Sequence, residues 1–247
     1  MWTYLVILIS ISIVFLVFIR RVVFHYRSAT EKKEDGSPPV NAPLNEDTTE
    51  GERISVSKKD KDRAEALCKK GLNLLKVGKD DEAIKCFVQA LALNELHDET
   101  QHRLAVLYLK KQMYGAAAAL FKRLVESSEN PVYYSHLGLA LYKQSSFEEA
   151  KNAYQRAVEL DPERAPRFVS LAQVYKALGQ FEHSVVALNK ALEIEKDNID
   201  FLLLLASIQV ELKNYQEARE VLEKILEITP KNIDAVTMLK DLKDLPS

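Results

Sequence analysis

The chain has little of what several common protein classes require. Only 7 of its 247 residues are glycine, which is few for a sheet protein with many tight turns, and two cysteines are too few for a disulfide framework. Cys68 and Cys86 also lack metal-ligand neighbours, so we expect both to be small buried hydrophobic residues. No Gly-rich phosphate loop, HExxH pair or nucleophile elbow occurs. These absences argue against an enzyme, and no metal or cofactor is expected.

Neither sign of charge is in excess. The chain has 34 Lys and Arg against 36 Asp and Glu, a formal net charge of -2, so the composition does not favour binding to nucleic acid. Alanine, leucine, glutamate and lysine are abundant instead, and all four favour helices. With 47% hydrophobic residues the chain can form a sizeable core. The composition therefore predicts an all-α protein.

One long run near the amino terminus carries no charge at all. The run WTYLVILISISIVFLVFI, from Trp2 to Ile19, is about as long as the shortest helices that cross a bilayer. A cleaved signal peptide would have basic residues before such a run, whereas here Arg20 and Arg21 follow it directly. We therefore expect residues 1–27 to be a retained transmembrane anchor with its basic flank. The position of the arginines predicts an amino terminus outside the cytoplasm and a carboxyl-terminal part inside it.

Residues 28–62 are polar, contain prolines and show no apolar periodicity. A segment of this composition cannot bury enough apolar surface to fold, so we expect a disordered linker that tethers the following domain to the membrane.

From residue 64 onward the sequence repeats itself. The segments KDDEAIKCFVQALALN, FEEAKNAYQRAVELDP and NYQEAREVLEKILEITP share an acidic residue before an alanine and a large apolar residue four positions after it. The alanine position recurs at Ala83, Ala117, Ala150, Ser184 and Ala218, at intervals of 34, 33, 34 and 34 residues by subtraction.

This period and these positions resemble the tetratricopeptide repeat (TPR), in which two antiparallel helices form one unit. The resemblance implies a right-handed α-solenoid of about five helix pairs over residues 63–232, with units at 64–97, 98–130, 131–164, 165–198 and 199–232. Residues 233–247 have Ile233, Val236, Leu239 and Leu242 at helical spacing, and they are expected to form a capping helix and tail.

Two recurrent positions predict how each helix pair packs. Small residues on the first helices are expected to face the alanine position of the second helices, so that the two backbones approach closely. Large residues on the second helices are expected to supply buried mass. The small residues are Gly71, Ala105, Gly138, Ala172 and Ala206, and the large ones are Phe87, Phe121, Tyr154, Leu188 and Leu222.

Family geometry also indicates which side chains of the first helices face the concave groove of the array. The expected peptide-binding residues are Cys68, Leu72, Leu75, His102, Val106, Leu109, Ser135, Leu139, Tyr142, Gln173 and Lys176. An apolar stripe over the first three units is thus predicted, with a basic rim formed by Lys69, Lys76, Arg103, Lys110 and Lys143. TPR domains that grip a terminal carboxylate use Lys and Asn where this chain has Cys68 and Leu72, so that activity is not expected.

Taken together, these features predict a membrane-anchored adaptor that holds an amphipathic helix or an extended apolar segment of a protein partner. The plan resembles bacterial factors that assist the assembly or quality control of envelope complexes, which favours the bacterial inner membrane. One alternative is a structural subunit of a membrane complex that self-assembles through its repeats as a homo-oligomer. An import receptor of an organelle outer membrane is a further alternative.

Overall fold

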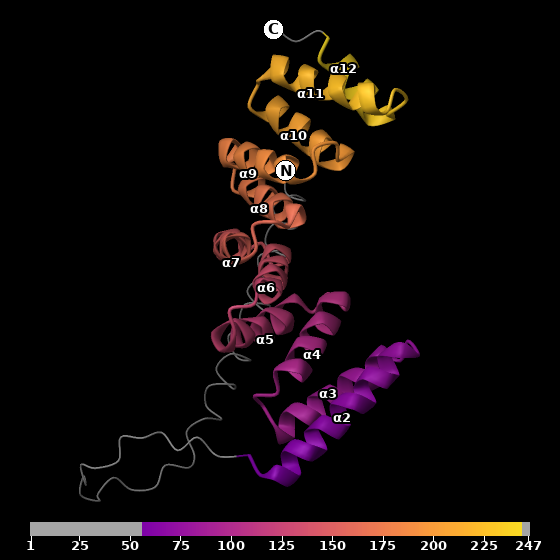
Figure 1. Ribbon diagram of the computed structural model, residues 1–247, viewed down its shortest axis with the longest axis vertical. Helices are drawn as coiled ribbons and strands as arrows, with labels where there is room; N and C mark the ends of the chain where they lie inside the picture. Colours follow the sequence, from indigo (N-terminus) through magenta and orange to yellow (C-terminus); the bar gives the residue numbers. More distant parts are fainter. Residues whose placement is uncertain (1–55, 244–247) are drawn as a thin grey trace, which may run out of the picture. The chain divides into compact units, whose positions relative to one another are not determined.

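Eleven α-helices and no strand make up residues 56–243, the part of the chain that the computed structural model describes (Figure 1). The chain divides into two units, residues 1–53 and 54–247, and all the described helices belong to the second. None of these helices combines the length and the apolar character that crossing a bilayer requires. The predicted span at residues 2–19 and most of the predicted linker lie outside the described residues.

The helices form five antiparallel pairs and one additional helix, stacked in sequence order (Figure 1). The predicted all-α TPR solenoid is confirmed. The first helices are α2 (Lys58–Lys76), α4 (Asp98–Lys110), α6 (Pro131–Lys143), α8 (Ala165–Ala177) and α10 (Ile199–Glu211). The second helices are α3 (Asp80–Leu93), α5 (Tyr114–Ser127), α7 (Phe147–Leu160), α9 (Phe181–Ile194) and α11 (Tyr215–Ile228), and α12 (Ile233–Asp241) follows them.

Helix α2 begins earlier than the repeat pattern indicates. It starts at Lys58, inside the range 28–62 that the sequence assigns to the linker. Ser57 provides the reason, because its Oγ accepts a hydrogen bond from the backbone N–H of Asp60 at 3.1 Å and so caps the first turn. The residues between Lys58 and Ala64 therefore extend the helix by more than one turn beyond the repeat unit.

The turn inside each unit has a left-handed residue just after the first helix. Gly78 and Gly179 occupy this position at φ +75° and +71°, and Gln112, Ser145 and Lys213 occupy it at 59° to 63°. Such a residue ends the first helix and reverses the chain into the second. Glycine accepts this conformation without strain, so the turns of the first and fourth units are the least strained of the five.

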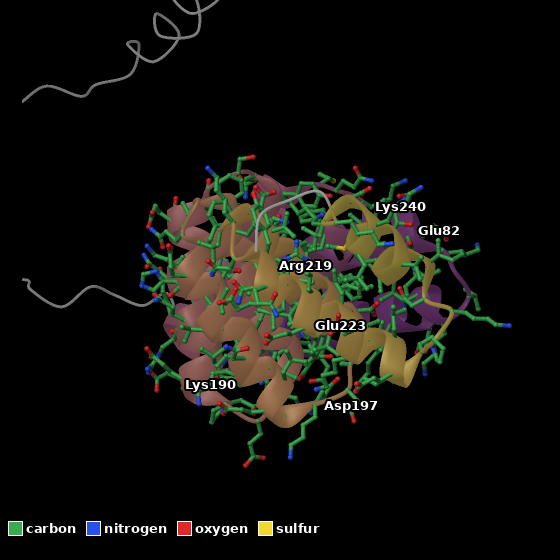
Figure 2. The ribbon with its side chains drawn as sticks, turned by 90° about the horizontal axis from the view of Figure 1, so that it is seen from above. Glu82, Lys190, Asp197, Arg219, Glu223 and Lys240 are labelled. Atoms are coloured by element: carbon green, nitrogen blue, oxygen red, sulfur yellow. The ribbon has the colours of Figure 1, made fainter. Side chains whose placement is uncertain are left out.

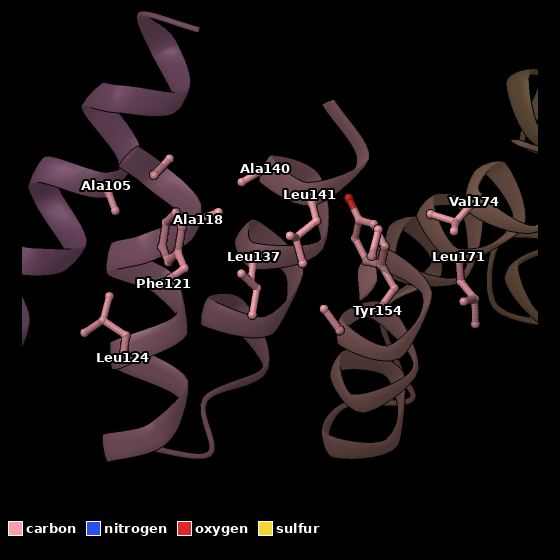
Figure 3. Close-up of a cluster of buried hydrophobic side chains, with 13 residues drawn as sticks. Ala105, Ala118, Phe121, Leu124, Leu137, Ala140, Leu141, Tyr154, Leu171 and Val174 are labelled. Atoms are coloured by element: carbon pink, nitrogen blue, oxygen red, sulfur yellow. The ribbon is translucent and has the colours of Figure 1, made fainter. Parts of the chain in front are cut away.

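The large residues of the second helices are buried as predicted. Phe87, Phe121, Leu188 and Leu222 have no accessible surface, and Tyr154 is 5% exposed. They belong to four apolar clusters that follow one another along the stack, and Figure 3 shows the largest, which includes Phe121, Leu137 and Tyr154. Each cluster combines residues of neighbouring units, so a single unit cannot bury its apolar surface alone.

The small residues of the first helices have a different nearest neighbour from the one expected. The two small positions do meet in the fourth unit, where Ser184 Oγ donates to the carbonyl of Ala172 at 2.7 Å. A Cβ atom on Gly71, however, would lie 2.5 Å from the Phe87 ring, and one on Gly138 would lie 2.8 Å from the Tyr154 ring. These glycines are needed because an aromatic ring of the second helix lies against the backbone of the first.

Ion pairs between units recur along the outer side of the array. A basic residue in a second helix pairs with an acidic residue that precedes its own unit, as in Arg123 with Glu95, and Lys224 with Asp197 at 3.5 Å. Arg156 pairs with Glu129 in the same way. Figure 2 shows charged side chains such as Lys190 and Asp197 projecting outward. Exposed pairs of this kind stabilise weakly, so they add to a stack that apolar burial holds together.

Helix α12 packs through only part of the apolar face that its sequence spacing predicts. Ala235 and Leu242 are buried against the last unit, but Ile233 is 78% exposed and Val236 is also exposed. Of the four residues at the expected spacing, Leu239 and Leu242 pack against the last unit, and Ile233 and Val236 do not. The packed side of α12 runs through Ala235, Met238, Leu239 and Leu242, because a small residue at 235 allows close approach to the neighbouring helix.

Candidate peptide-binding groove

Several of the predicted groove residues line one hollow beside α2 and α4. The hollow has a volume of about 630 Å³, an apolar part from Leu72 and Leu75, and a basic part from Lys69, Lys76 and Arg103. All five residues were assigned to the groove or its rim from the sequence, and the structure brings them together. Asn73 also lines the hollow, and sequence reasoning missed it because its register position does not belong to the groove set of the family.

The apolar stripe continues onto α4 and α6, but much of it is half-buried. Leu109, Leu139 and Tyr142 pack against the cluster around Phe121, and the Tyr142 ring lies 5.5 Å from the Phe147 ring. Val106 is the more accessible member, at 37% exposure. The side chains of the stripe therefore contribute to the core and are also partly accessible. Val106 is the residue of the stripe whose replacement disturbs the core least.

Cys68 does not line the groove. It is 3% exposed and belongs to the buried cluster that contains Phe87 and Leu104, so its assignment as a peptide-binding residue is corrected. The physical reason is that α3 packs closely on α2, and Leu104 and Leu107 of α4 belong to the same cluster, so a short side chain at this level is covered completely. The expectation that Cys68 and Cys86 are buried, unpaired cysteines is confirmed.

Ser135 is engaged in a contact between units. Its Oγ donates to the carbonyl of Pro131 at 2.8 Å and accepts from Nε of Arg167 at 3.2 Å. Arg167 also forms an ion pair with Asp161, which lowers the pKa of that carboxyl group. Arg167 of α8 therefore links α8 to α6. Because Ser135 already takes part in two hydrogen bonds, it has little capacity left to bind a ligand.

The fourth unit contributes polar side chains to the predicted surface. Gln173 is exposed, whereas Lys176 is partly buried and its Nζ lies 3.4 Å from Ser207 Oγ as a hydrogen-bond donor. The apolar part of the candidate groove therefore lies on the first three units, as the sequence indicates.

The basic rim is partly neutralised by the protein itself. Lys69 pairs with Glu65 at 2.8 Å and Arg103 pairs with Glu99 at 2.7 Å, each one helical turn away. Lys110 pairs with Asp80 of α3 at 2.5 Å, so its charge is partly neutralised within the protein. Lys76 and Lys143 are exposed and form no ion pair with any residue of the described range. These two lysines are the rim residues best placed to meet an acidic ligand.

His102 lies in an aromatic cluster between the second and third units. Its ring is 5.9 Å from His136 and 5.1 Å from Tyr133, and Phe121 contacts both imidazoles. His102 Nε2 and His136 Nδ1 are buried and have no hydrogen-bond partner among the described residues. Burial lowers the pKa of both histidines, an effect that Arg103 increases at His102 and Glu99 opposes. Two neutral imidazoles therefore form part of the junction rather than an open binding surface.

This junction predicts a loss of stability in mild acid. As the pH falls through the ordinary histidine value of 6.5, the unfolded chain takes up protons at these two positions before the folded chain does. The free energy of unfolding should therefore fall from pH 7 to about pH 5.5. The double variant His102→Gln, His136→Gln should show a smaller fall in denaturant titrations at the two pH values. An unchanged fall would mean that other groups cause it.

No group of three His, Cys, Asp or Glu residues within residues 56–243 is arranged to hold a metal ion. The candidate groove is open and mainly apolar, with a basic rim. Its chemistry is that of a surface for binding another polypeptide.

Comparison with known proteins agrees with the repeat architecture. The family described as the cytochrome c-type biogenesis protein H TPR domain matches residues 108–236, and a tetratricopeptide repeat family matches residues 64–97. Among curated proteins, the chain is 28% identical over 120 residues to RNA polymerase II-associated protein 3 of Homo sapiens, which is 48% of this chain and 18% of that protein. It is 26% identical over 107 residues to BBSome complex member BBS4 of Bos taurus, or 43% of this chain and 21% of that protein. The chain spans about a fifth of the length of these relatives.

Solved structures show the same fold at low sequence identity. YrrB, a TPR protein with an unusual peptide-binding site, has a TM-score of 0.66 and 21% identity, over 74% of this chain and 94% of that one. MamA from Desulfovibrio magneticus RS-1 has a TM-score of 0.64 and 18% identity, over 70% and 98%. PilF of Pseudomonas aeruginosa has a TM-score of 0.58 and 21% identity, over 75% and 85%.

Proposed function

Since this chain belongs to the family of the cytochrome c-type biogenesis protein H TPR domain, we propose that it is a membrane-anchored adaptor for a protein partner. The partner contributes an amphipathic helix or an extended apolar segment, which lies along the first helices of units one to three. TPR domains bind protein or peptide partners. The membrane anchor, the kind of partner segment and the surface that binds it belong to this proposal.

The hollow between α2 and α4 is the observation that carries the proposal. Leu72 and Leu75 present apolar surface there, while Lys69, Lys76 and Arg103 surround it with positive charge. A helix with apolar residues at i, i+3 or i+4 and i+7 fits such a surface, and acidic residues on its flanks would meet the lysines. The apolar contacts would provide most of the affinity, and the charges would mainly set the association rate and its salt dependence.

The relatives support this assignment in two ways. The family takes its name from cytochrome c-type biogenesis protein H, so a role in the assembly or quality control of a membrane-associated complex is consistent with membership. YrrB shares the fold and has a peptide-binding site, so a solenoid of this size is sufficient to bind a peptide.

The membrane part of the proposal rests on the sequence. The uncharged run from Trp2 to Ile19 has the length of a short membrane helix, and Arg20 and Arg21 after it favour a cytoplasmic repeat domain. In this arrangement the groove faces cytoplasmic segments of membrane proteins, and we place the protein in the bacterial inner membrane.

Site-specific photo-crosslinking in cells tests the adaptor function. A photoreactive amino acid in place of Val106, on the groove side of α4, should give a crosslink to a distinct partner protein. The matched position is Val186 on α9, which is 61% exposed and is not among the predicted groove residues, and it should not give that product. A crosslink from position 106 to a second copy of the chain would support the structural subunit instead. The same product from both positions would contradict a groove-specific partner.

Two further variants separate apolar from electrostatic contributions. Val106→Glu should reduce the crosslinked partner about tenfold or more while the melting temperature stays nearly unchanged, because Val106 is the most accessible apolar residue of the stripe. Val106 is chosen instead of Leu109 and Tyr142, because those two residues contact the core and replacing them would also lower stability. Lys76→Gln with Lys143→Gln should weaken capture mainly at low salt. Lys85→Gln with Lys231→Gln, two exposed lysines away from the groove, should have no effect.

A further inference from the structure

The first and last helices of the array each have one uncovered side. Every helix from α3 to α11 packs against the helix before it and the helix after it, whereas no described helix precedes α2 or follows α12. These two helices lie at opposite ends of the stack (Figure 1). The interior helices therefore bury two sides, and each end helix presents one side to solvent.

The uncovered side of α2 is hollowed. The hollow has a volume of about 640 Å³ and is lined by Ala66, Lys69, Lys70, Asn73, Leu74 and Val77. By subtraction, Lys70 and Asn73 stand 34 residues before Leu104 and Leu107, which are buried in a cluster with residues of α3. In the second unit, this side of the first helix thus packs against the preceding helix. On α2 the same side has no described helix to meet, and Val77 is 68% exposed.

This outer hollow is distinct from the candidate groove. Leu72 and Leu75 line only the groove, whereas Leu74 and Val77 line only the outer hollow. Because a helical residue is turned by about 100° from the one before it, the two sets leave α2 in different directions. A contact at the outer hollow therefore leaves the apolar part of the groove accessible to a partner.

The uncovered side of α12 is apolar and has acidic residues beside it. Ile233 is 78% exposed and Val236 is 49% exposed, on the side of the helix opposite the buried Leu242. Asp234 and Asp241 flank this side, are exposed, and form no ion pair with a described residue. This end of the array thus offers apolar surface together with uncompensated negative charge.

The two ends differ in charge. Helix α2 has seven basic and three acidic residues, whereas residues 215–241, which contain α11 and α12, have four basic and six acidic residues. Lys59, Arg63 and Lys70 recur on the uncovered side of α2 and form no ion pair with a described residue. Contact between unlike ends brings opposite charges together, and contact between two like ends brings equal charges together.

We propose that the uncovered side of α2 in one copy of the chain binds the uncovered side of α12 in a second copy, so that the stack of helices continues from one molecule into the next. Successive first helices of the array run parallel, and α12 and α2 are both first helices. In the same parallel orientation Ile233 and Val236 face Leu74 and Val77, and Asp234 approaches the basic residues of α2. One helix against another buries less area than a standard interface, so the association is weak and reversible.

The position of Lys240 favours this orientation. Lys240 also lies on the uncovered side of α12, and in an antiparallel contact it would meet the basic part of α2. In the parallel contact it lies beyond Val77, where Asp81 and Glu82 occupy the first turn of α3. Figure 2 shows Lys240 and Glu82 on the same side of the array when it is viewed from above. A second copy displaced along the array therefore brings these two residues toward each other.

Cysteine cross-linking of the purified full-length protein in detergent micelles tests the contact. Two differently tagged chains, one with Val77→Cys and one with Ile233→Cys, are mixed and treated with a short bismaleimide. Cys68 and Cys86 are buried, and the chain without added cysteines is the blank. The yield between positions 77 and 233 should exceed that between Val186→Cys and Ile233→Cys at least about fivefold, because binding raises the local concentration. Val186 is 61% exposed on α9, away from both ends.

The size of the products shows whether the ends join without closing. One chain that carries both Val77→Cys and Ile233→Cys should give dimers, trimers and larger products, since a contact between unlike surfaces leaves one free surface at each end. Products no larger than a dimer would show a closed pair and overturn the continued stack. Equal yields from positions 77 and 186 would overturn the proposal as well.

Charge reversal tests the complementarity. Lys59→Glu, Arg63→Glu and Lys70→Glu together should lower the yield between positions 77 and 233 at least about fivefold, while helix content and melting temperature stay nearly unchanged. A second chain that carries Asp234→Lys and Asp241→Lys should recover the yield with this variant. A yield that the first reversal leaves unchanged, or that the second does not recover, would contradict the charge complementarity on which the contact depends.

Discussion

Replacing Gly138 with leucine is expected to lower the free energy of unfolding by more than about 2 kcal/mol, because the position has no room for a side chain. A Cβ atom on Gly138 would lie 2.8 Å from the ring of Tyr154, closer than Cβ atoms approach other heavy atoms in proteins. The ring cannot move away easily, since Tyr154 belongs to the same buried cluster as Leu171 and Val174 (Figure 3). Chemical denaturation of the purified protein measures the loss.

Two controls make this result specific to crowding. Gly115→Ala also changes a helical glycine, but the nearest atom to a Cβ there is Gln144 Oε1 at 3.8 Å, so it should be neutral or stabilise by up to about 1 kcal/mol. Lys122→Leu on the surface of α5 should cost little beyond its exposed ion pair with Glu149. Equal losses for Gly138→Leu and Lys122→Leu would contradict the packing described for the third unit.

The chain itself contains the compensating change. Gly71 and Gly138 lie against Phe87 and Tyr154, whereas the fourth unit has Ala172 with Leu188 in the same positions. Gly138→Ala combined with Tyr154→Leu copies the pair of the fourth unit. The double variant should therefore lose less stability than the sum of the two single variants, by about 0.5 kcal/mol or more. Strictly additive losses of stability would show that residue 138 and the ring of Tyr154 do not interact.

The sequence predicts the repeat architecture well because every unit repeats the same local signals. The alanine positions from Ala83 to Ala218 fix the period, and helices α4, α6, α8 and α10 begin 33 or 34 residues apart, at 98, 131, 165 and 199 by their first residues. Periodicity of this kind depends on contacts within a unit and with the next one, and each copy confirms the others.

The depth of a side chain in the groove is harder to predict from the sequence. The position in a repeat gives the direction in which a side chain leaves its helix, but a neighbouring unit decides whether it is covered. Cys68 is buried under residues of α3 and α4, and Ser135 is engaged by Arg167 from the next unit. Arg167 and Ser135 are 32 residues apart and lie in different units, so the sequence gives no signal for that contact.

The end of the array shows a related limit. Helical spacing groups Ile233 and Val236 with Leu239 and Leu242, yet α12 packs through Ala235, Leu239 and Leu242 and leaves Ile233 and Val236 exposed. In a complete unit a second helix would lie beside this one, and no such helix follows α12 within the described residues. Apolar periodicity therefore identifies the helix without identifying which side of it contacts α11.

Replacing Phe121 with alanine is expected to cost about 3–5 kcal/mol, the range for removing a fully buried aromatic ring. Phe121 has no accessible surface and belongs to the central cluster together with Ala105, Leu137 and Tyr154 (Figure 3). The cavity left by the ring lies between the second and third units, so the loss should appear as unfolding of the array and not as local fraying. Leu96→Ala provides the control, because Leu96 is 75% exposed and its truncation should change the free energy of unfolding by less than about 0.5 kcal/mol.

The same variant should also change the response to acid. The Phe121 ring lies 6.2 Å from His102 and 5.2 Å from His136, and it contributes to the burial that lowers the pKa of both imidazoles. Without the ring, water can reach the two histidines, and their pKa values should return toward the ordinary value. The additional loss of stability between pH 7 and about pH 5.5 should therefore be smaller in Phe121→Ala than in the unmodified protein. A full acid-dependent loss in this variant would show that burial beneath Phe121 does not keep the histidines neutral.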